Sequence, residues 1–334
     1  MQSVISKSPP SSHGVRSQAV VEAIKARAAR WCAGDRSGDG RKLGLVIEGG
    51  GMRGVHSGGG AVALGHLGFT ELFDEVYATS AGAMNAAYFL AHQGELGITI
   101  YYENLASRRF LNPLRLWKVL DVDYVFDHVV TVAKPLDVPR ILSGRPDFFV
   151  SVMDERNGEG LLIDVKKTRT SVLDVLKAAT AIPVLYNRTV NVDGRRCMDG
   201  GLRIPFPIEH ALERSCTDLL ILLTRPAEFV CPAPGHGSRF MFNAICARGN
   251  RGLYGAYVRH NEREADTRDL ALGRSEVPAG VNIATICTDE PETIARDCVD
   301  AVALRDAAVA YGRKVLRAFG ADADGWDLAP NRQP

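Results

Sequence analysis

The sequence lacks any long hydrophobic run. Its longest uninterrupted candidate, Leu219 to Leu223, falls far short of the roughly 18 apolar residues that a membrane-spanning helix needs. The segment from Met1 to Arg16 also lacks the apolar stretch of a secretory signal and contains much serine, proline and glycine. We therefore expect a flexible lead over residues 1–17, a cytoplasmic protein, and membrane contact that is peripheral at most.

An excess of charge of either sign is missing too. Lysine and arginine total 40 against 39 aspartate and glutamate residues. Non-specific nucleic-acid binding depends on a basic surface that neutralises phosphates, so the composition gives no support for a nucleic-acid partner. The apolar content of 46% is ordinary for a globular protein and sufficient for a core. We expect a helix and linker over 18–41, one large domain over 42–320, and a flexible tail over 321–334.

Paired cysteines are absent as well. The seven cysteines are odd in number and widely spaced, and none forms a Cys-x-x-Cys pair. Disulfide frameworks and zinc sites both need paired or clustered thiols. We therefore expect neither, and interpret the cysteines as small buried hydrophobic side chains in a reducing compartment. No metal and no cofactor is expected.

Helical and strand patterns alternate along the chain. Apolar spacing predicts helical segments at 18–32, 53–67, 81–91, 101–132, 171–180, 240–272 and 294–319. Short apolar runs predict strands at 43–47, 74–78, 219–224 and 281–288, and two hairpins at 148–165 and 189–198. Because a strand, a helix and a strand follow one another from Leu43 to Ala78, we expect a parallel βαβ unit with antiparallel pieces added to it.

The first chemical motif is Glu48-Gly49-Gly50-Gly51-Met52-Arg53-Gly54, where a buried strand turns into a helix. Only glycine lets several successive amides approach a ligand without obstruction. Amides at the positive end of a helix favour a phosphate or a developing oxyanion. A tight turn without a ligand is the structural alternative. The motif also matches the dinucleotide fingerprint Gly-x-Gly-x-x-Gly, with Glu71 near its acidic position, so a nucleotide-binding module stays open.

The second motif is Tyr77-Ala78-Thr79-Ser80-Ala81-Gly82-Ala83, a strand that leads through a serine into a helix. A nucleophile elbow needs small residues beside its serine, because strand and helix approach closely there. It presents the serine hydroxyl at a helix N-terminus, which stabilises an alkoxide. As structure alone, Ser80 would be a helix N-cap. Since it follows the glycine motif by one βα unit, we expect Ser80 to be a nucleophile.

The third motif is Asp199-Gly200-Gly201, at the end of an apolar strand. An aspartate before glycine is common in plain turns. Its position after a hairpin, however, places a carboxylate at a sheet edge, where serine chemistry needs a base.

In this order the three motifs resemble those of the patatin-like phospholipases, particularly the bacterial intracellular members. The resemblance spans residues 42–211 and includes Ala178 to Pro183, which is similar to the helix end that precedes the family's aspartate. It implies a three-layer α/β/α fold with a mostly parallel central sheet. It also implies a Ser-Asp dyad without histidine, with Ser80 as nucleophile and Asp199 as base. Its oxyanion loop would contain Gly50, Gly51, Met52 and Arg53, and its supporting motif glycines would be Gly49, Gly54, Gly82, Gly200 and Gly201.

The resemblance implies hydrolysis of carboxylic esters of lipids or phospholipids, with no cofactor and with a lipid or ester substrate as the partner. The oligomeric state is not indicated. One position departs from the family pattern: Ala78 stands where the serine motif usually has glycine. The aromatic and basic stretch from Tyr101 to Lys118 could form a cap that touches lipid, although packing and solvated surface are the commoner roles of such residues.

Two other functions remain besides the nucleotide-binding module. A triad hydrolase would use one of three histidines downstream of the serine, namely His210, His236 and His260. A lipid-binding scaffold would keep the fold but lose catalysis at Ala78.

Overall fold

The computed structural model describes residues 18–115, 118–186, 188–289 and 294–328. In this part of the chain, a sheet of eight strands forms the centre of the molecule, in the order β5-β6-β3-β2-β1-β7-β8, with β4 also paired to β3. The strands are β1 (Leu43–Ile47), β2 (Glu75–Thr79), β3 (Asp147–Asp154), β4 (Gly160–Asp164), β5 (Val190–Val192), β6 (Arg195–Asp199), β7 (Asp218–Leu222) and β8 (Asn282–Ile286).

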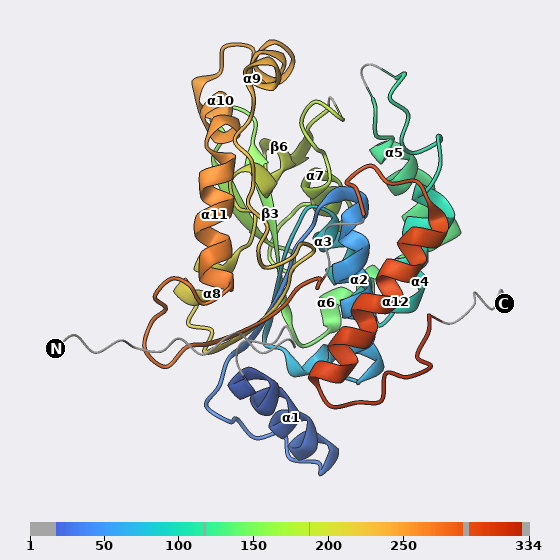
Figure 1. The fold of residues 1–334 in the computed structure, drawn as a ribbon, viewed down its shortest axis with the longest axis vertical. Coiled ribbons are helices and arrows are strands. Elements are labelled where there is room, and N and C mark those ends of the chain that lie inside the picture. The colour runs from blue at the N-terminus through green and yellow to red at the C-terminus, as the bar shows by residue number, and fades with distance from the viewer. Residues whose placement is uncertain (1–17, 116–117, 187, 290–293, 329–334) are drawn as a thin grey trace.

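Helices cover both faces of this sheet (Figure 1). α2, α3, α4 and α12 lie on one side, and α8, α10 and α11 lie on the other. The helices are α1 (Gln18–Cys32), α2 (Val55–His66), α3 (Ala81–Leu90), α4 (Gly94–Thr99), α5 (Val122–Tyr124), α6 (Val138–Ser143), α7 (Val172–Ala179), α8 (Ile208–Glu213), α9 (His236–Phe242), α10 (Arg251–Val258), α11 (His260–Ala271) and α12 (Ala301–Ala318). Short 3-10 or π segments are η1 (Gly51–Gly54), η2 (Thr70–Leu72), η3 (Ile100–Leu105), η4 (Val125–Ala133), η5 (Gly200–Leu202) and η6 (Asn243–Ala247).

The middle of the sheet is parallel, and one end is antiparallel. β1 pairs in parallel with β2 and β7, β2 with β3, and β7 with β8. β3 is antiparallel to both β4 and β6, and β5 is antiparallel to β6. β1, β2 and β7 are buried along their whole length, as expected for parallel strands with helices on both faces. The predicted α/β/α fold with a mostly parallel sheet is confirmed.

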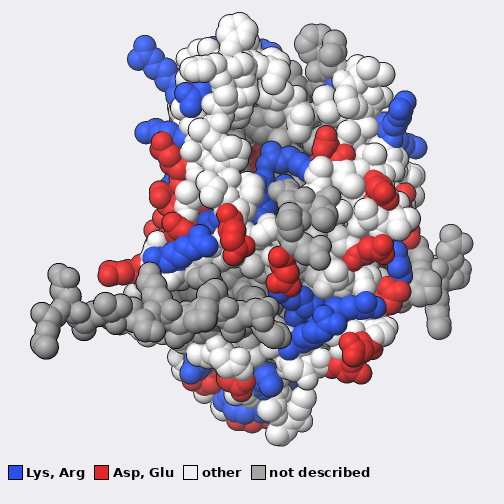
Figure 2. Space-filling view, viewed as in Figure 1, with Lys and Arg blue, Asp and Glu red and all other residues white. Residues whose placement is uncertain are grey.

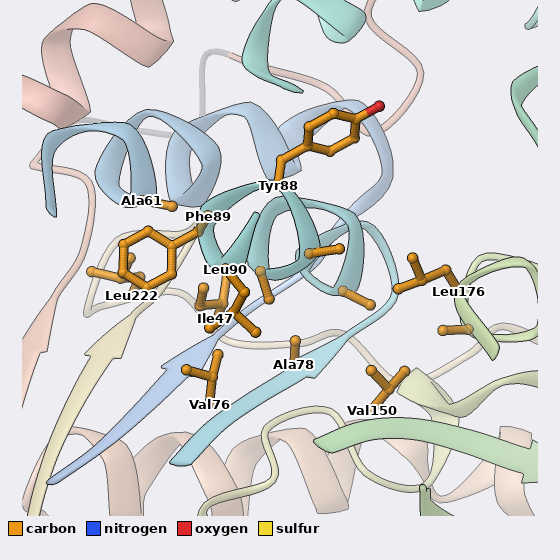
Figure 3. Close-up of a cluster of buried hydrophobic side chains, with 14 of the residues drawn as sticks. Ile47, Ala61, Val76, Ala78, Tyr88, Phe89, Leu90, Val150, Leu176 and Leu222 are labelled. Atoms are coloured by element: carbon orange, nitrogen blue, oxygen red, sulfur yellow. The ribbon is translucent and has the colours of Figure 1, made fainter. Parts of the chain in front are cut away.

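The core between the sheet and α3 contains the position that departs from the family pattern. Figure 3 shows the methyl group of Ala78 pointing from β2 toward α3. Phe89 and Leu90 of α3 and Ile47 of β1 belong to the same buried cluster as Ala78. The extra methyl group therefore has a place in the hydrophobic core.

Several predicted elements match closely, and both predicted hairpins are present as β3 with β4 and β5 with β6. The segment 101–132 is helical only at its ends, in η3 and in α5 with η4. The helical region predicted at 240–272 is divided, because Arg248 and Gly249 take positive φ angles of 47° and 86°. The closing helix begins at Ala301, not at Ile294, because the Asp300 side chain caps it by accepting two backbone hydrogen bonds.

The expected flexible tail over 321–334 is described only in part. Its described part, residues 321–328, packs against α12: Ala323 and Leu328 are buried, and Asp327 pairs with Arg305 at 2.8 Å. The remaining tail residues and the expected lead over 1–17 lie outside the described residues. Within the described chain, no helix combines the length and the hydropathy needed to cross a membrane.

Candidate active site

Ser80 lies in a strained turn between β2 and α3. Its backbone has φ 54° and ψ −133°, an unfavourable conformation for a residue with a side chain. The turn is tight because strand and helix nearly touch. A Cβ added to Gly82 would lie 2.4 Å from the Ile47 carbonyl oxygen, and one added to Gly49 would lie 2.7 Å from Cβ of Ser80. Ser80 therefore has the backbone of a nucleophile elbow, and Gly49 and Gly82 are needed for its close packing.

Asp199 lies next to Ser80 because β3 pairs with both of the strands that precede these residues or end at them. Thr79, the last residue of β2, pairs with Ser151, and Asp199, the last residue of β6, pairs with the next residue, Val152. The two strand ends are thus brought together by consecutive residues of β3. The Ser80 hydroxyl donates a hydrogen bond of 2.5 Å to Oδ2 of Asp199.

The backbone around Asp199 fixes its carboxylate. The Gly201 amide donates to Oδ1 at 2.8 Å, and the Asp199 amide donates to the carbonyl oxygen of Ala181, in the segment before the hairpin. A Cβ on Gly200 would lie 2.6 Å from the backbone of Ser151, so glycine is required there. Burial raises the pKa of Asp199 to about 6, although hydrogen bonds from Ser80 and Gly201 oppose the rise. Such a carboxylate is ionised at neutral pH, yet more basic than an exposed aspartate.

The glycine loop lies directly before α2, beside Ser80. Gly50 and Gly51 have φ angles of 137° and 63°, which favour glycine. A buried residue from outside the motif, Thr224, holds the loop: its hydroxyl donates to the Gly49 carbonyl oxygen at 3.0 Å, and its amide donates to the Glu48 carboxylate at 2.5 Å. Burial raises the pKa of that Glu48 carboxyl.

Arg53 and Met52, at the end of the glycine loop, make different contacts. The Arg53 side chain lies under Gly50, where an added Cβ would be 3.1 Å from its guanidinium. The Met52 amide donates to the carbonyl oxygen of Arg296 at 3.0 Å. Thus, of the four predicted oxyanion-loop residues, Met52 already has an acceptor for its amide in this conformation. Neither Thr224 nor Arg296 belongs to a sequence motif, so sequence reasoning missed both.

The structure does not support the dinucleotide fingerprint. The acidic residue of that fingerprint follows the second strand, where it would meet a ribose. Glu71 lies before β2, in η2, at the end opposite to Ser80. Its carboxylate pairs with His92 and Arg140 and accepts from the Arg145 amide. Glu71 therefore serves as an ion-pair partner near the surface.

An apolar cavity of about 570 Å³ begins at Ser80. It extends between α3, η3 and the chain leading to α5, and its walls are almost entirely hydrocarbon. Its lining residues include Met84, Tyr88, Ile100, Leu111, Val125 and Phe126. The volume and the lining suit a hydrocarbon chain.

A second cavity, of about 310 Å³, meets the first at Ser80 and also contains Asp199. Its wall combines apolar side chains with more charged groups than the apolar cavity has, and we call it the charged cavity. The charged groups include Glu48, Arg53, Arg225, His260, Glu264 and Arg296. Arg296 is exposed and lines both cavities. Its positive charge lowers the pKa of Asp199, although burial outweighs this effect.

Only one of the three candidate histidines, His260, lines a described cavity with Ser80. His210 lies in α8, and His236 is exposed at the start of α9. Possible ligand atoms of His260, Cys231 and Glu264 lie within 4.8 Å of one another. The Glu264 carboxylate is, however, 3.4 Å from the Arg268 guanidinium. Arginine therefore already neutralises the charge that would attract a metal ion.

The chain is similar to a protein family, to another protein sequence and to a solved structure. A family model described as patatin-like phospholipase matches residues 45–212, which is half of the chain. The uncharacterized protein YjjU of Escherichia coli K12 is 26% identical over 193 residues, covering 56% of this chain and 53% of that protein. The chain thus spans about half the length of this relative. The crystal structure of VipD from Legionella pneumophila is 14% identical in sequence and has a TM-score of 0.38. The aligned region covers 84% of this chain and 66% of the VipD chain.

The matched family region contains the glycine loop, the elbow at Ser80 and the Asp199 turn. The chain belongs to the patatin-like phospholipase family.

Proposed function

We propose that this protein hydrolyses carboxylic esters of lipids, with Ser80 as nucleophile and Asp199 as its base. One observation carries the proposal. The hydrogen-bonded Ser80 and Asp199 lie where an apolar cavity of about 570 Å³ meets a charged cavity. An ester that has a hydrocarbon chain on one side and a polar group on the other fits this junction with its carbonyl carbon at Ser80.

The proposed reaction has two steps. Ser80 Oγ attacks the ester carbonyl carbon while its proton passes to Oδ2 of Asp199, 2.5 Å away. The tetrahedral intermediate collapses, Asp199 gives the proton to the leaving alcohol, and the acyl group stays on Ser80. Water then attacks the acyl-enzyme while Asp199 takes its proton. The bond between the acyl carbon and Ser80 Oγ breaks, Asp199 returns the proton to Oγ, and the free carboxylic acid is released.

We assign the oxyanion to the backbone amides of the glycine loop. Gly50 and Gly51 present their amides without side chains, at the start of η1 and α2, where the helix dipole favours negative charge. The Met52 amide could join them only if its hydrogen bond to the Arg296 carbonyl oxygen opened. We place Arg53 as a support beneath the loop, because its guanidinium packs against Gly50.

The charged cavity is suited to bind a leaving group that carries a negative charge. Arg296 is exposed and contributes a guanidinium group to the wall of this cavity, and guanidinium groups bind phosphate well. Arg53 and Arg225 are buried, and their charges are offset by Glu48 and Glu264. A phospholipid or lysophospholipid would therefore place its acyl chain in the apolar cavity and its phosphate in the charged one.

Labelling with a fluorophosphonate probe tests the nucleophile. We expect the probe to modify Ser80, and Ser80→Ala to abolish both labelling and turnover of p-nitrophenyl esters. A Ser80→Ala variant with normal turnover would show that the nucleophile is assigned wrongly. Because His260 lines the charged cavity, His260→Ala tests the triad alternative: a folded His260→Ala variant without activity, beside an active Asp199→Asn variant, would replace the dyad by a triad.

A further inference from the structure

Two parts of the chain project from the same end of the molecule, on either side of the site. The first, which we call the α9 projection, consists of residues 236–251. The second, which we call the 106–120 loop, leads into α5 and is described at residues 106–115 and 118–120. In Figure 1 both stand at the upper end of the long axis, and Figure 2 shows the surface hollowed between them. Residues far apart in the sequence therefore form one end face.

Both projections expose large apolar side chains. Phe240 and Met241, in the α9 projection, are 77% and 48% exposed, and Leu114, in the 106–120 loop, is 84% exposed. Single exposed apolar residues are common. Here, however, they lie on two separate projections beside the same cavities, a distribution that packing within the chain does not explain.

Both projections are also free of acidic residues. The α9 projection contains Arg239, Arg248 and Arg251, and the 106–120 loop contains Arg108, Arg109, Arg115 and Lys118. Arg115 and Lys118 pair with Asp121. Arg248, Arg251, Arg108 and Arg109 are exposed, and none of these four forms an ion pair within the described residues. The whole chain has a net charge of only +1, so this positive charge is a local feature of the end face.

The two projections border the cavities that meet at Ser80. Phe110, Leu111 and Pro113 of the 106–120 loop line the apolar cavity, and Met241 and Phe242 of the α9 projection line the charged cavity. A surface that binds both projections would therefore cover the entrance to Ser80.

From these observations we propose that the end face made by the α9 projection and the 106–120 loop docks on a membrane that contains anionic lipid. Phe240, Met241 and Leu114 insert among the acyl chains, and the exposed arginines contact lipid phosphates. The complementarity of charge favours an anionic bilayer over a neutral one. Docking in this orientation lets a lipid pass into the cavities without leaving the apolar environment.

Vesicle flotation with the full chain carrying Ser80→Ala tests this surface without lipid turnover. We expect binding to vesicles of phosphatidylcholine and phosphatidylglycerol, weaker binding to phosphatidylcholine alone, and a loss of the difference at high salt. Leu114→Ser combined with Phe240→Ser should lower partitioning at least about tenfold on both kinds of vesicle. Arg248→Gln combined with Arg251→Gln should lower it on anionic vesicles only, by about fivefold or more.

The matched control is Leu142→Ser, which removes another exposed leucine, 45% exposed, on α6 away from the end face. It should bind vesicles as the parent does. With Ser80 restored, the Leu114 and Phe240 variant should hydrolyse soluble p-nitrophenyl esters normally, which shows that it is folded. Unchanged vesicle binding in that variant, or no vesicle binding by the parent chain, would overturn the docking surface. A chain that binds vesicles but hydrolyses no ester would instead contradict the proposed function alone.

Discussion

Ser80 and Asp199 are 119 positions apart in the sequence, yet the Ser80 hydroxyl donates directly to the Asp199 carboxylate at 2.5 Å. No side chain lies between the two groups to relay a proton. The contact exists because β3 pairs with the end of β2 at Ser151 and with the end of β6 at Val152. Catalysis by this pair would therefore depend on a buried carboxylate that acts alone as base.

Replacing Asp199 by asparagine should remove most of the turnover. Asparagine has the size of aspartate and can still accept hydrogen bonds from Ser80 and Gly201, but it cannot take the hydroxyl proton at neutral pH. Loss of a positioned base typically lowers the rate about 10²- to 10⁴-fold. Steady-state turnover of p-nitrophenyl esters measures the change. A normal rate in Asp199→Asn would rule out the dyad.

The same substitution should make the protein more stable at alkaline pH. Because the folded-state pKa of Asp199, about 6, lies above its ordinary value, ionisation of this buried group lowers the free energy of unfolding as pH rises from about 4 to about 6. Asp199→Asn removes this loss and should therefore raise the free energy of unfolding by roughly 1–3 kcal/mol at pH 8. Thermal melting of both proteins at pH 4 and pH 8 tests it. The stabilisation should be absent at pH 4, and equal effects at both pH values would contradict the assignment.

Ester turnover should rise with pH, reach half of its maximum near pH 6 and form a plateau above about pH 7. Asp199 accepts a proton only when it is ionised, and its pKa is raised to about 6 by burial. The profile of kcat/KM against pH, measured with an uncharged ester, reports this group in the free enzyme. A profile already flat at pH 4.5 would mean that the base has an ordinary carboxyl pKa.

Ala78→Gly should destabilise the protein but leave its turnover at least as high as that of the wild type. The substitution removes a buried methyl group and adds backbone freedom within β2, which together cost about 1–2 kcal/mol. Turnover should survive because the methyl group points into the hydrophobic core between β2 and α3 (Figure 3). Thermal melting and ester turnover measure the two effects. A large rate loss in a well-folded variant would show that the elbow depends on alanine.

Arg296→Gln should weaken the use of anionic substrates and shift the pH profile. Arg296 lines both cavities, and its charge lowers the pKa of Asp199. Without it, the rising limb of kcat/KM should move to higher pH, and KM for a lysophospholipid should increase about tenfold, while KM for a neutral ester changes little. Arg317→Gln, on the far end of α12, is the control and should behave as the wild type. Equal effects on both substrates would contradict a role in anion binding.

The sequence alone determined the local chemistry of this protein. The glycine loop, the elbow at Ser80 and the Asp199-Gly200-Gly201 turn could each be predicted because close backbone approach tolerates few residue types. The strand β1 and the helix α1 were also predictable, because the spacing of apolar residues within each segment is enough to indicate the element. Such features depend on neighbours within a few residues.

The tertiary structure decided what surrounds these motifs. Thr224 and Arg296 reach the glycine loop from segments far along the chain and carry no local pattern that would mark them. The two cavities and the end face likewise combine side chains from many segments, so their shape and charge follow from packing. The division of the 240–272 region depended on the positive φ angles at Arg248 and Gly249, which helical periodicity does not encode. Non-local packing thus determined the shape and charge of the cavities at Ser80.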